Sequence, residues 1–322
     1  MRKSKILIRS LVIIYLCFGF LSGIGLCAEP DFCINASDSS GGWQKGMVTQ
    51  RKVAFTDKAK IKSKAQIYVP NKGNYQLVAY LYHNWRKNCP CIYVEAIDSA
   101  GMSHAGYHKI ENAWYLGPQD QGRWFFISLS DNPYWDLPEG IMGLTFWAEA
   151  RDSAWGYISV PMENKVSIAQ FFLIPVTGSN SKTFLSWFPD IGSGSGNWQI
   201  CDYDHAYATN LIKTSEKNSL FCVNSTMPVT SYYVGLLSVL PESDGSLGVE
   251  IKNAASDKKS LIKLKANKEW NIVYMRPVKL NKGACSIYFK NLNQNKVMID
   301  YFFLIPVGQS FDDTSPVTKI AG

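Results

Sequence analysis

The alternation of apolar and polar positions along the chain predicts a protein built of short β-strands. The segment 75–82 is apolar, rich in residues that favour strands, and bounded by Gly73 and Asn84. The segments 124–129 and 143–147 have the same character, and no long segment shows a clean helical period. Turn signals rich in Gly and Asn recur between these runs. The pattern therefore predicts an all-β, antiparallel β-sandwich fold.

An internal repeat is the strongest signal in the sequence. The run FFLIPV occurs at 171–176 and again at 302–307, and a Trp-Gln pair opens each copy at Trp43 and Trp198. The final Val of the run lies 133 positions after that Trp in copy one and 109 positions after it in copy two, so copy one carries 24 more residues. Extra residues between shared landmarks are loop insertions on a common scaffold.

The repeat predicts two tandem β-sandwich domains. We place a leader at 1–27, a first sandwich with long aromatic loops at 28–178, and a compact second sandwich at 179–310. A short tail at 311–322 completes the chain. The proposed boundary falls in a polar, Gly- and Ser-containing stretch of the kind that links domains.

The first residues have the pattern of a signal peptide. Residues 1–9 carry basic side chains and no acid, and an apolar run extends from Leu11 to Leu26. We expect cleavage after Cys27 or Ala28, and hence a secreted, periplasmic or cell-surface protein. A lipid anchor on Cys27 and an uncleaved membrane anchor are the alternatives.

The charge of the chain changes once the leader is set aside. The whole sequence has 33 basic and 26 acidic residues, four of the basic ones within the leader, which leaves 29 − 26 = +3. This balance argues against a nucleic-acid-binding surface, which is strongly basic. Hydrophobic residues make up 46% of the chain and aromatic residues 13%, enough for two cores rich in strands.

The cysteines suggest disulfides if the chain is exported. Of eight cysteines, six follow the leader, and an oxidising compartment favours their pairing. We expect Cys201 to pair with Cys222, and Cys33 to pair with Cys89 or Cys91. Buried thiols are the alternative, because a free cysteine packs well as a small apolar residue. No cysteine or histidine spacing is typical of a zinc site.

The second half of each copy resembles that of galactose-binding-like jelly rolls, including carbohydrate-binding modules of families 6 and 35. In copy two the resemblance is carried by Trp270, Leu280, Gly283, Phe289, Asn295 and Ile299-Asp300-Tyr301. It is a fold-level signature, and this fold serves many functions. The resemblance implies a ligand site among the end loops, with Asn164 and Asn295 at the place of a ligand-binding Asn. It also implies a structural calcium ion at Asp300 in copy two alone, since copy one has Ala169 there.

Aromatic residues in the loops of copy one suggest where a sugar would bind. Copy one holds seven of the ten tryptophans. The flat face of a pyranose stacks on an aromatic ring while polar groups bond its hydroxyls. The predicted ligand-binding residues are Trp85, Arg86, Trp114, Tyr115, Tyr134, Trp135, Trp155, Tyr157 and Asn164. The alternative is that these rings pack beneath long loops.

Three functions follow in order of preference. We expect a non-catalytic protein that binds a glycan or polysaccharide, without nucleic acid, and meets a membrane only through its leader or a lipid anchor. A structural protein of the cell envelope is the alternative. A polysaccharide-active enzyme ranks third: His83, or His104 and His108 in a loop with Tyr107, would have to abstract a proton. No serine-nucleophile elbow, phosphate loop or metalloprotease motif occurs. The oligomeric state is left open.

Overall fold

A computed structural model describes residues 33–84, 89–109, 122–130, 134–151, 159–160, 165–176, 185–187, 194–201, 211–253, 256–266, 269–307 and 320–321. Within these ranges the regular structure is antiparallel β-strand, with one short 3-10 turn, η1, at Ala36–Asp38. This confirms the all-β prediction. No helix in the described ranges is long and apolar enough to span a membrane. The expected leader lies outside them.

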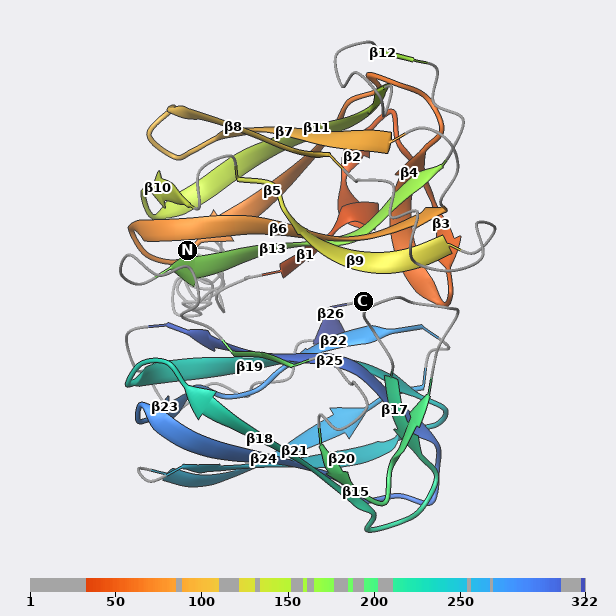
Figure 1. Cartoon of the computed structure of the whole chain (residues 1–322), viewed down its shortest axis with the longest axis vertical. Helices are drawn as coiled ribbons and strands as arrows, with labels where there is room; N and C mark the ends of the chain where they lie inside the picture. Colours follow the sequence, from red (N-terminus) through yellow and green to blue (C-terminus); the bar gives the residue numbers. More distant parts are fainter. Residues whose placement is uncertain are drawn as a thin grey trace, which may run out of the picture. The chain divides into compact units, whose positions relative to one another are not determined.

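The first sandwich consists of two facing sheets (Figure 1). One sheet has seven strands: β1 (Cys33–Asn35), β3 (Gln44–Val48), β4 (Arg51–Thr56), β6 (Gly73–Asn84), β9 (Gly122–Ser128), β10 (Trp135–Leu137) and β13 (Val166–Val176). The other has six: β2 (Ser40–Gly41), β5 (Ser63–Val69), β7 (Cys89–Ile97), β8 (Ser103–Lys109), β11 (Gly140–Arg151) and β12 (Ser159–Val160). The order β2-β5-β11-β7-β8 of the six-stranded sheet places β7 between β11 and β8, so side chains of these three strands lie side by side on its outer face.

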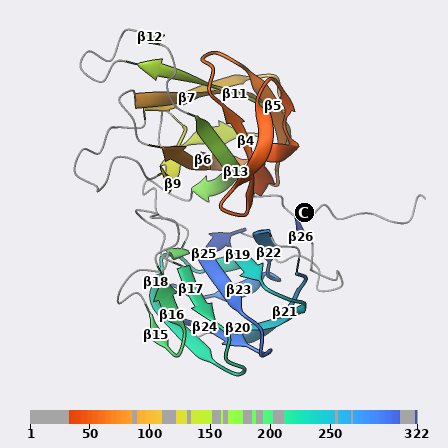
Figure 2. The same ribbon diagram turned by 90° about the vertical axis from the view of Figure 1, so that its right-hand side faces the viewer.

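The second sandwich repeats this arrangement (Figure 2). Its eight-stranded sheet contains β14 (Leu185–Trp187), β16 (Gln199–Cys201), β17 (Leu211–Thr214), β19 (Ser231–Pro241), β22 (Asn271–Tyr274), β23 (Val278–Leu280), β25 (Val297–Pro306) and β26 (Ile320–Ala321). Its five-stranded sheet contains β15 (Ser195–Gly196), β18 (Leu220–Met227), β20 (Gly245–Asn253), β21 (Ser256–Leu264) and β24 (Gly283–Asn291). The strand β26, from the predicted tail, pairs with β22.

Each sandwich has its own core, formed by the inward-facing residues of its two sheets. Alternate side chains of a strand point to opposite faces, so every second residue enters the core. In β11, Leu144, Phe146 and Ala148 are buried while the residues between them face outward. In β24, Ile287 and Phe289 are buried in the same way. The alternation read from the sequence is thus the alternation between core and surface.

The last strand of each copy departs from this alternation because both of its faces are covered. In β13, Phe171 packs in the first core, and its neighbour Phe172 belongs to a further apolar cluster. In β25, Phe302 and Phe303 divide in the same way. Strands covered on both faces read as continuous apolar runs. This accounts for the repeated FFLIPV sequence.

The further cluster joins the two sandwiches, which belong to one compact unit. Rings from both seven- and eight-stranded sheets meet within it: the centroid of Tyr301 lies 5.5 Å from that of Tyr80 and 5.3 Å from that of Phe126. Phe172 and Phe303 are 5.6 Å apart. Edge-to-face pairs of this kind add to the burial of apolar area. The apolar face of each last strand is therefore an interface within the chain.

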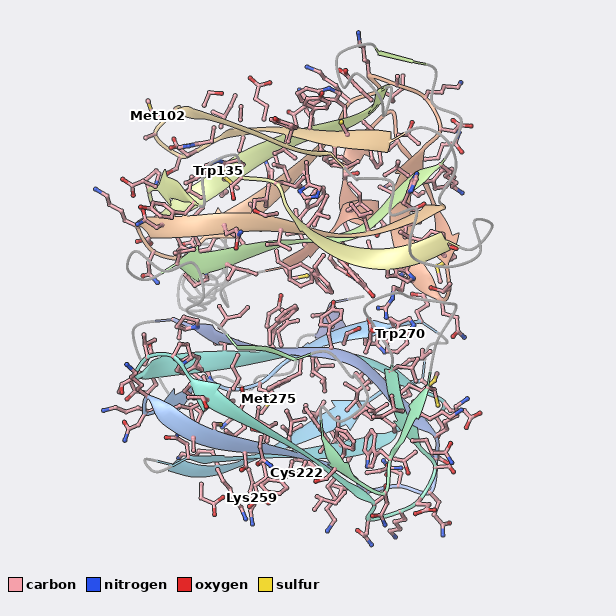
Figure 3. All side chains as sticks on the ribbon, in the orientation of Figure 1. Met102, Trp135, Cys222, Lys259, Trp270 and Met275 are labelled. Atoms are coloured by element: carbon pink, nitrogen blue, oxygen red, sulfur yellow. The ribbon has the colours of Figure 1, made fainter. Side chains whose placement is uncertain are left out.

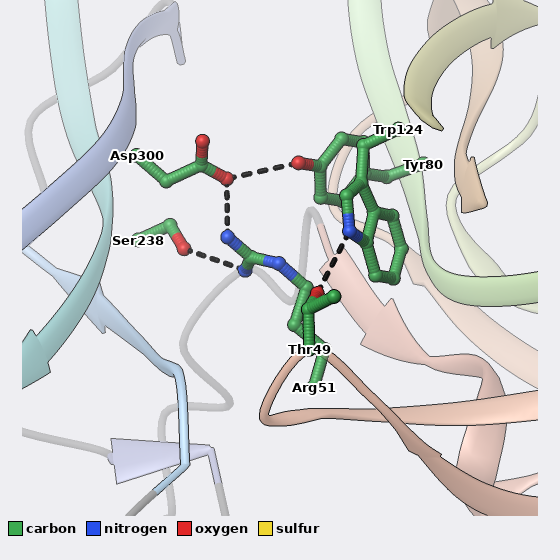
Figure 4. A network of polar contacts seen from close by, with 6 residues as sticks. All are labelled: Thr49, Arg51, Tyr80, Trp124, Ser238 and Asp300. Atoms are coloured by element: carbon green, nitrogen blue, oxygen red, sulfur yellow. Dashed lines mark hydrogen bonds and ion pairs between the residues drawn. The ribbon is translucent and has the colours of Figure 1, made fainter. Parts of the chain in front are cut away.

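A polar network lies at the edge of this interface (Figure 4). The Arg51 guanidinium donates to the Asp300 carboxylate at 2.5 Å and to the Ser238 hydroxyl at 3.1 Å. The Tyr80 hydroxyl donates to the same carboxylate oxygen at 2.9 Å. The guanidinium carbon also lies 4.1 Å from the centroid of the Trp270 ring, in cation–π geometry. The side chains of Arg51 and Asp300 are 2% and 4% exposed, so this ion pair is buried.

Asp300, the calcium ligand that the family resemblance implies, is engaged by Arg51 and Tyr80, and calcium binding there stays a prediction. Strand pairing skips Asp300 between Ile299 and Tyr301, and it skips Ala169 at the equivalent point of copy one. Both residues sit at a β-bulge, which redirects a side chain out of the regular alternation. In copy two the bulge directs the carboxylate to Arg51. Within the described residues, no group of three His, Cys, Asp or Glu side chains could hold a metal ion.

The expected disulfide between Cys201 and Cys222 is not formed. Cys201 lies in β16, where its thiol contacts the Gln199 carbonyl oxygen at 3.9 Å. Cys222 lies in β18, where its thiol contacts the Asn224 side-chain oxygen at 3.7 Å. The two strands belong to different sheets of the second sandwich, which separates the thiols.

The other expected pairing, of Cys33 with Cys89 or Cys91, is not supported by the described residues. Cys33 lies in β1 of the seven-stranded sheet, within the interface cluster. Cys91 lies in β7 of the six-stranded sheet, and it forms no disulfide with Cys33. The side chain of Cys89 falls outside the described residues.

Candidate functional site

The outer face of the six-stranded sheet carries a row of three aromatic side chains. Trp147 of β11 is directly opposite Tyr93 of β7, and Tyr93 is directly opposite Tyr107 of β8. Trp147 and Tyr93 alternate with core residues such as Phe146 and Val94, so their side chains point away from the core. Tyr107 is exposed on the same face. The register of three neighbouring strands thus places Trp147, Tyr93 and Tyr107 side by side, and we call these three residues the aromatic row.

The rings of the aromatic row stack on one another with an offset. The centroids of Tyr93 and Trp147 lie 5.4 Å apart with an interplanar angle of 10°, and those of Tyr93 and Tyr107 lie 5.8 Å apart at 22°. These separations exceed the ~3.5–4 Å of direct contact between atoms, so the rings are displaced sideways and part of each face stays uncovered. Tyr107, at the end of the row, is 52% exposed.

Charged groups fix the other end of the row. The Lys62 ammonium lies 4.6 Å from the Trp147 ring centroid, in cation–π geometry. The Trp147 indole N–H donates to a Glu149 carboxylate oxygen at 3.2 Å. These two contacts hold the indole in one orientation. The row therefore ends in a fixed indole at β11 and an open phenol at β8.

The turn between β7 and β8 aligns the two tyrosines. The Asp98 carboxylate accepts hydrogen bonds from the backbone N–H groups of Ala100 and Met102, each at 2.9 Å, and pairs with His104 at 2.9 Å. The hydrogen bond from His104, followed by those from the backbone, holds the pKa of the Asp98 carboxyl below its ordinary value. The ionised Asp98 carboxylate accepts the hydrogen bonds of the backbone N–H groups in the turn, and these bonds set the register of the hairpin.

An open groove with a volume of about 570 Å³ lies on the same face, next to the aromatic row. It is lined by Asp38, Ser40, Lys64, Ala65, Gln66, Ile97, Gly143, Leu144 and Thr145. Thr145 stands two residues before Trp147 on β11 and pairs with Lys64 of β5. The groove lining thus combines apolar residues with residues that carry amide, hydroxyl, ammonium and carboxylate groups. Row and groove together form a continuous surface across four strands.

The second sandwich lacks this row. Phe289 of β24 occupies the place of Phe146 in the repeat, so Lys290 stands where copy one has Trp147. Lys290 pairs with Gly248 of β20, and Gly248 pairs with Leu261 of β21. The equivalent row is therefore Lys, Gly and Leu, without an aromatic ring.

The structure assigns Trp135, one of the predicted ligand-binding residues, to the core. The Trp135 side chain is 6% exposed and packs with the inner residues of the first sandwich (Figure 3). Strand β10 pairs with the start of β6, which turns the indole inward, where its ring lies 5.6 Å from that of His104. For this residue the packing alternative is correct. Its neighbour Tyr134 is half-buried, just before β10.

Most of the other predicted site residues lie outside the described ranges. These are Trp85, Arg86, Trp114, Tyr115, Trp155, Tyr157 and Asn164. Their part in ligand binding stays a prediction. Asn295, the equivalent of Asn164 in copy two, is described, and its backbone carbonyl accepts a hydrogen bond from the Asn291 side chain at 3.0 Å.

The histidines considered for catalysis are separated by the fold. His83 is 1% exposed on the seven-stranded sheet, and burial lowers its pKa from 6.5 to about 4. His104 and His108 lie on β8 of the other sheet, which is a regular strand rather than the expected loop. His104 is engaged by Asp98.

Sequence reasoning missed Tyr93 and the alignment of the row. The predicted ligand-binding residues were loop residues, whereas Tyr93, Tyr107 and Trp147 all lie on strands. The signal that could have found the row was period-two alternation: Tyr93 stands between Ile92 and Val94, and Trp147 between Phe146 and Ala148. An aromatic residue at the outward position of such a strand lies on the surface of the sheet.

No protein-family model matches the chain, and no characterised protein matches it in sequence. Its fold is similar to those of solved structures, several of which are carbohydrate-binding modules. The tandem CBM22-1–CBM22-2 domains of Paenibacillus barcinonensis Xyn10C are 9% identical with a TM-score of 0.29, over 87% of this chain and 94% of that one. TmCBM61, solved in complex with β-1,4-galactotriose, is 9% identical with a TM-score of 0.28, over 44% of this chain and 91% of that one.

A third similar structure is much longer than this chain. The xanthan lyase of Paenibacillus is 12% identical with a TM-score of 0.34, over 85% of this chain and 26% of that one. This chain thus spans about a quarter of the length of the lyase. At these identities the likeness concerns the fold alone.

Proposed function

We propose that the chain is a non-catalytic glycan-binding protein of the cell exterior, with its ligand site on the outer face of the six-stranded sheet. The observation that carries the proposal is the aromatic row beside the open groove. A pyranose presents a flat apolar face that stacks on a ring, and hydroxyls that need polar partners. Tyr107 offers the open ring, and Lys64, Gln66 and Thr145 offer polar groups nearby.

The shape of this surface favours part of a polysaccharide chain over a single small molecule. The groove is open along the sheet rather than enclosed, and the row continues it across β11, β7 and β8. An extended surface of this kind holds several sugar units through a few contacts each.

Binding to a panel of soluble polysaccharides, measured by affinity electrophoresis and then by calorimetry, tests the proposal. The Tyr107→Ala and Trp147→Ala variants should each bind polysaccharide at least about tenfold more weakly than the unaltered chain. The reason is that truncation of a central aromatic contact costs about 1–2 kcal/mol or more of binding free energy. Leu261→Ala is the matched control: this side chain is 59% exposed and occupies the equivalent row of copy two. Its affinity should equal that of the unaltered chain.

Two outcomes would overturn the proposal. One is that the unaltered chain retains no polysaccharide at concentrations of tens of micromolar. The other is that it binds, but the Tyr107→Ala and Trp147→Ala variants, with unchanged circular dichroism, bind equally well. The first outcome would favour the alternative role of a structural spacer in the envelope. The second would move the site to another surface.

A further inference from the structure

We propose a second, anion-selective binding pocket in the second sandwich that accepts one acidic sugar residue. The pocket has a volume of about 240 Å³ and is lined by Asn197, Gln199, Lys213, Thr214, Ser215, Glu216 and Lys296. It is smaller than the ~300–1,000 Å³ of pockets for larger ligands, so it suits a single small molecule or one unit at the end of a chain. It does not depend on the aromatic row.

Comparison of the two copies shows how the pocket arises. Gln199 pairs with Lys213 in copy two, and Gln44 pairs with Phe55 in copy one. The following residues also correspond, since Thr214 pairs with Val297 and Thr56 pairs with Val166. Lys213 thus stands where copy one has Phe55.

The same comparison relates the two lysines that precede the last strands. Lys165 immediately precedes β13, and Lys296 immediately precedes β25. In copy one the Lys165 ammonium lies 3.3 Å from the centroid of the Phe55 ring, which occupies this position and provides a cation–π partner. In copy two, Lys213 replaces the ring, and a pocket lined by Lys213 and Lys296 lies there instead.

The charge of the pocket favours an anion. Among the described residues, neither Lys213 nor Lys296 has a carboxylate within the 4.0 Å of an ion pair. Glu216 is the one acid of the lining, so two positive charges face one negative charge. A ligand carboxylate between the two ammonium groups would relieve their repulsion and gain charge-assisted hydrogen bonds.

The neutral groups of the lining explain why the ligand would be a sugar acid. Gln199 and Asn197 provide amides that both donate and accept, and Ser215 provides a hydroxyl. These groups match the hydroxyls of a hexuronate, whereas an inorganic anion would use the ammonium groups alone. The pocket therefore combines one charged contact with several neutral ones.

Calorimetric titration with sodium glucuronate tests this inference, with glucose and sodium acetate as separate arms. We expect a dissociation constant on the order of 1 mM for glucuronate in low salt, and at least tenfold weaker binding of glucose and acetate. Lys213→Met and Lys296→Met should each weaken glucuronate binding at least tenfold. Lys258→Met, an exposed lysine on β21, is the matched control and should have no effect.

One variant tests the comparison between copies directly. Lys213→Phe should place a ring in the pocket as Phe55 does in copy one, and should abolish glucuronate binding while the melting temperature is kept. Tyr107→Ala, which tests the aromatic row, should leave glucuronate binding unchanged, so the two proposals can fail separately. Equal binding of acetate and glucuronate would reduce the pocket to a nonspecific anion site. Equal binding by Lys213→Met and the unaltered chain would also overturn the inference.

Discussion

Replacement of Arg51 by Met tests the buried contact between the two sandwiches. The guanidinium and the Asp300 carboxylate are 2% and 4% exposed, and both come from strands that line the shared apolar cluster. Arg51→Met keeps the aliphatic part of the side chain and removes the charge. The Asp300 carboxylate would then be left in an apolar environment, where it accepts a hydrogen bond from the Tyr80 hydroxyl.

The expected loss follows from this burial. Removal of one member of a buried ion pair costs about 3–5 kcal/mol, because the other charge is left uncompensated. That is a large part of the ~5–15 kcal/mol by which a folded domain is typically stable. Replacing both residues, as in Arg51→Met with Asp300→Leu, should restore most of the loss, because no charge then stays buried.

The pH dependence of the variant provides a sharper test. Burial raises the pKa of the Asp300 carboxyl, and Arg51 partly offsets this effect. Without Arg51 the folded-state pKa rises further above the unfolded value. The folded state then binds more protons than the unfolded state between these two pKa values, so stability should increase as pH falls through that window. The gain approaches about 1.4 kcal/mol per pH unit within it.

Guanidinium-induced unfolding, followed by tryptophan fluorescence at several pH values between 5 and 8, measures both effects. Lys52→Met is the matched control, since Lys52 pairs with Glu269 at 2.9 Å but their side chains are 44% and 30% exposed. That variant should lose less than about 1 kcal/mol. A loss for Arg51→Met as small as that of the control, with no dependence on pH, would refute the reasoning.

Two further predictions concern the first sandwich. Burial lowers the pKa of His83 from 6.5 to about 4, so between these two pH values the unfolded chain binds a proton at His83 and the folded chain does not. The free energy of unfolding should therefore fall by about 3 kcal/mol between pH 6.5 and pH 4. In urea unfolding, His83→Gln should show a weaker dependence of this free energy on pH. The same dependence in both proteins would contradict the burial of a neutral His83. Gly106→Ala would place a Cβ 1.7 Å from the Leu129 carbonyl oxygen, and should lower the melting temperature and weaken polysaccharide binding. Gly143→Ala, whose nearest contact would be 3.9 Å, should melt like the unaltered chain.

The fold was largely predictable from local patterns in the sequence. Alternation at positions such as Leu144 and Phe146 placed strands correctly, and the repeated FFLIPV run marked the last strand of each copy. These features are local because the period of two belongs to the backbone itself. The repeat added the inference of two sandwiches, since the same landmarks recur in the same order.

The partners of individual side chains were decided by tertiary structure. The sequence separates Arg51 from Asp300 by 249 positions, and nothing local in either indicates the pair. The sequence predicts Trp135 to be a ligand-binding residue in a loop, yet the pairing of β10 with β6 turns its ring into the core. In both cases the contact depends on which elements meet, and sequence spacing does not encode that.

The aromatic row shows the same division within one site. The sequence supplies Tyr93, Tyr107 and Trp147, and it shows that two of them alternate with apolar residues. Their alignment in a row depends on the fold, because Trp147 pairs with Tyr93 across strands that are distant in the chain. A shift of one residue in that register would turn the whole outward set of one strand into the core. The surface is thus a product of strand register, while the strands are a product of local sequence.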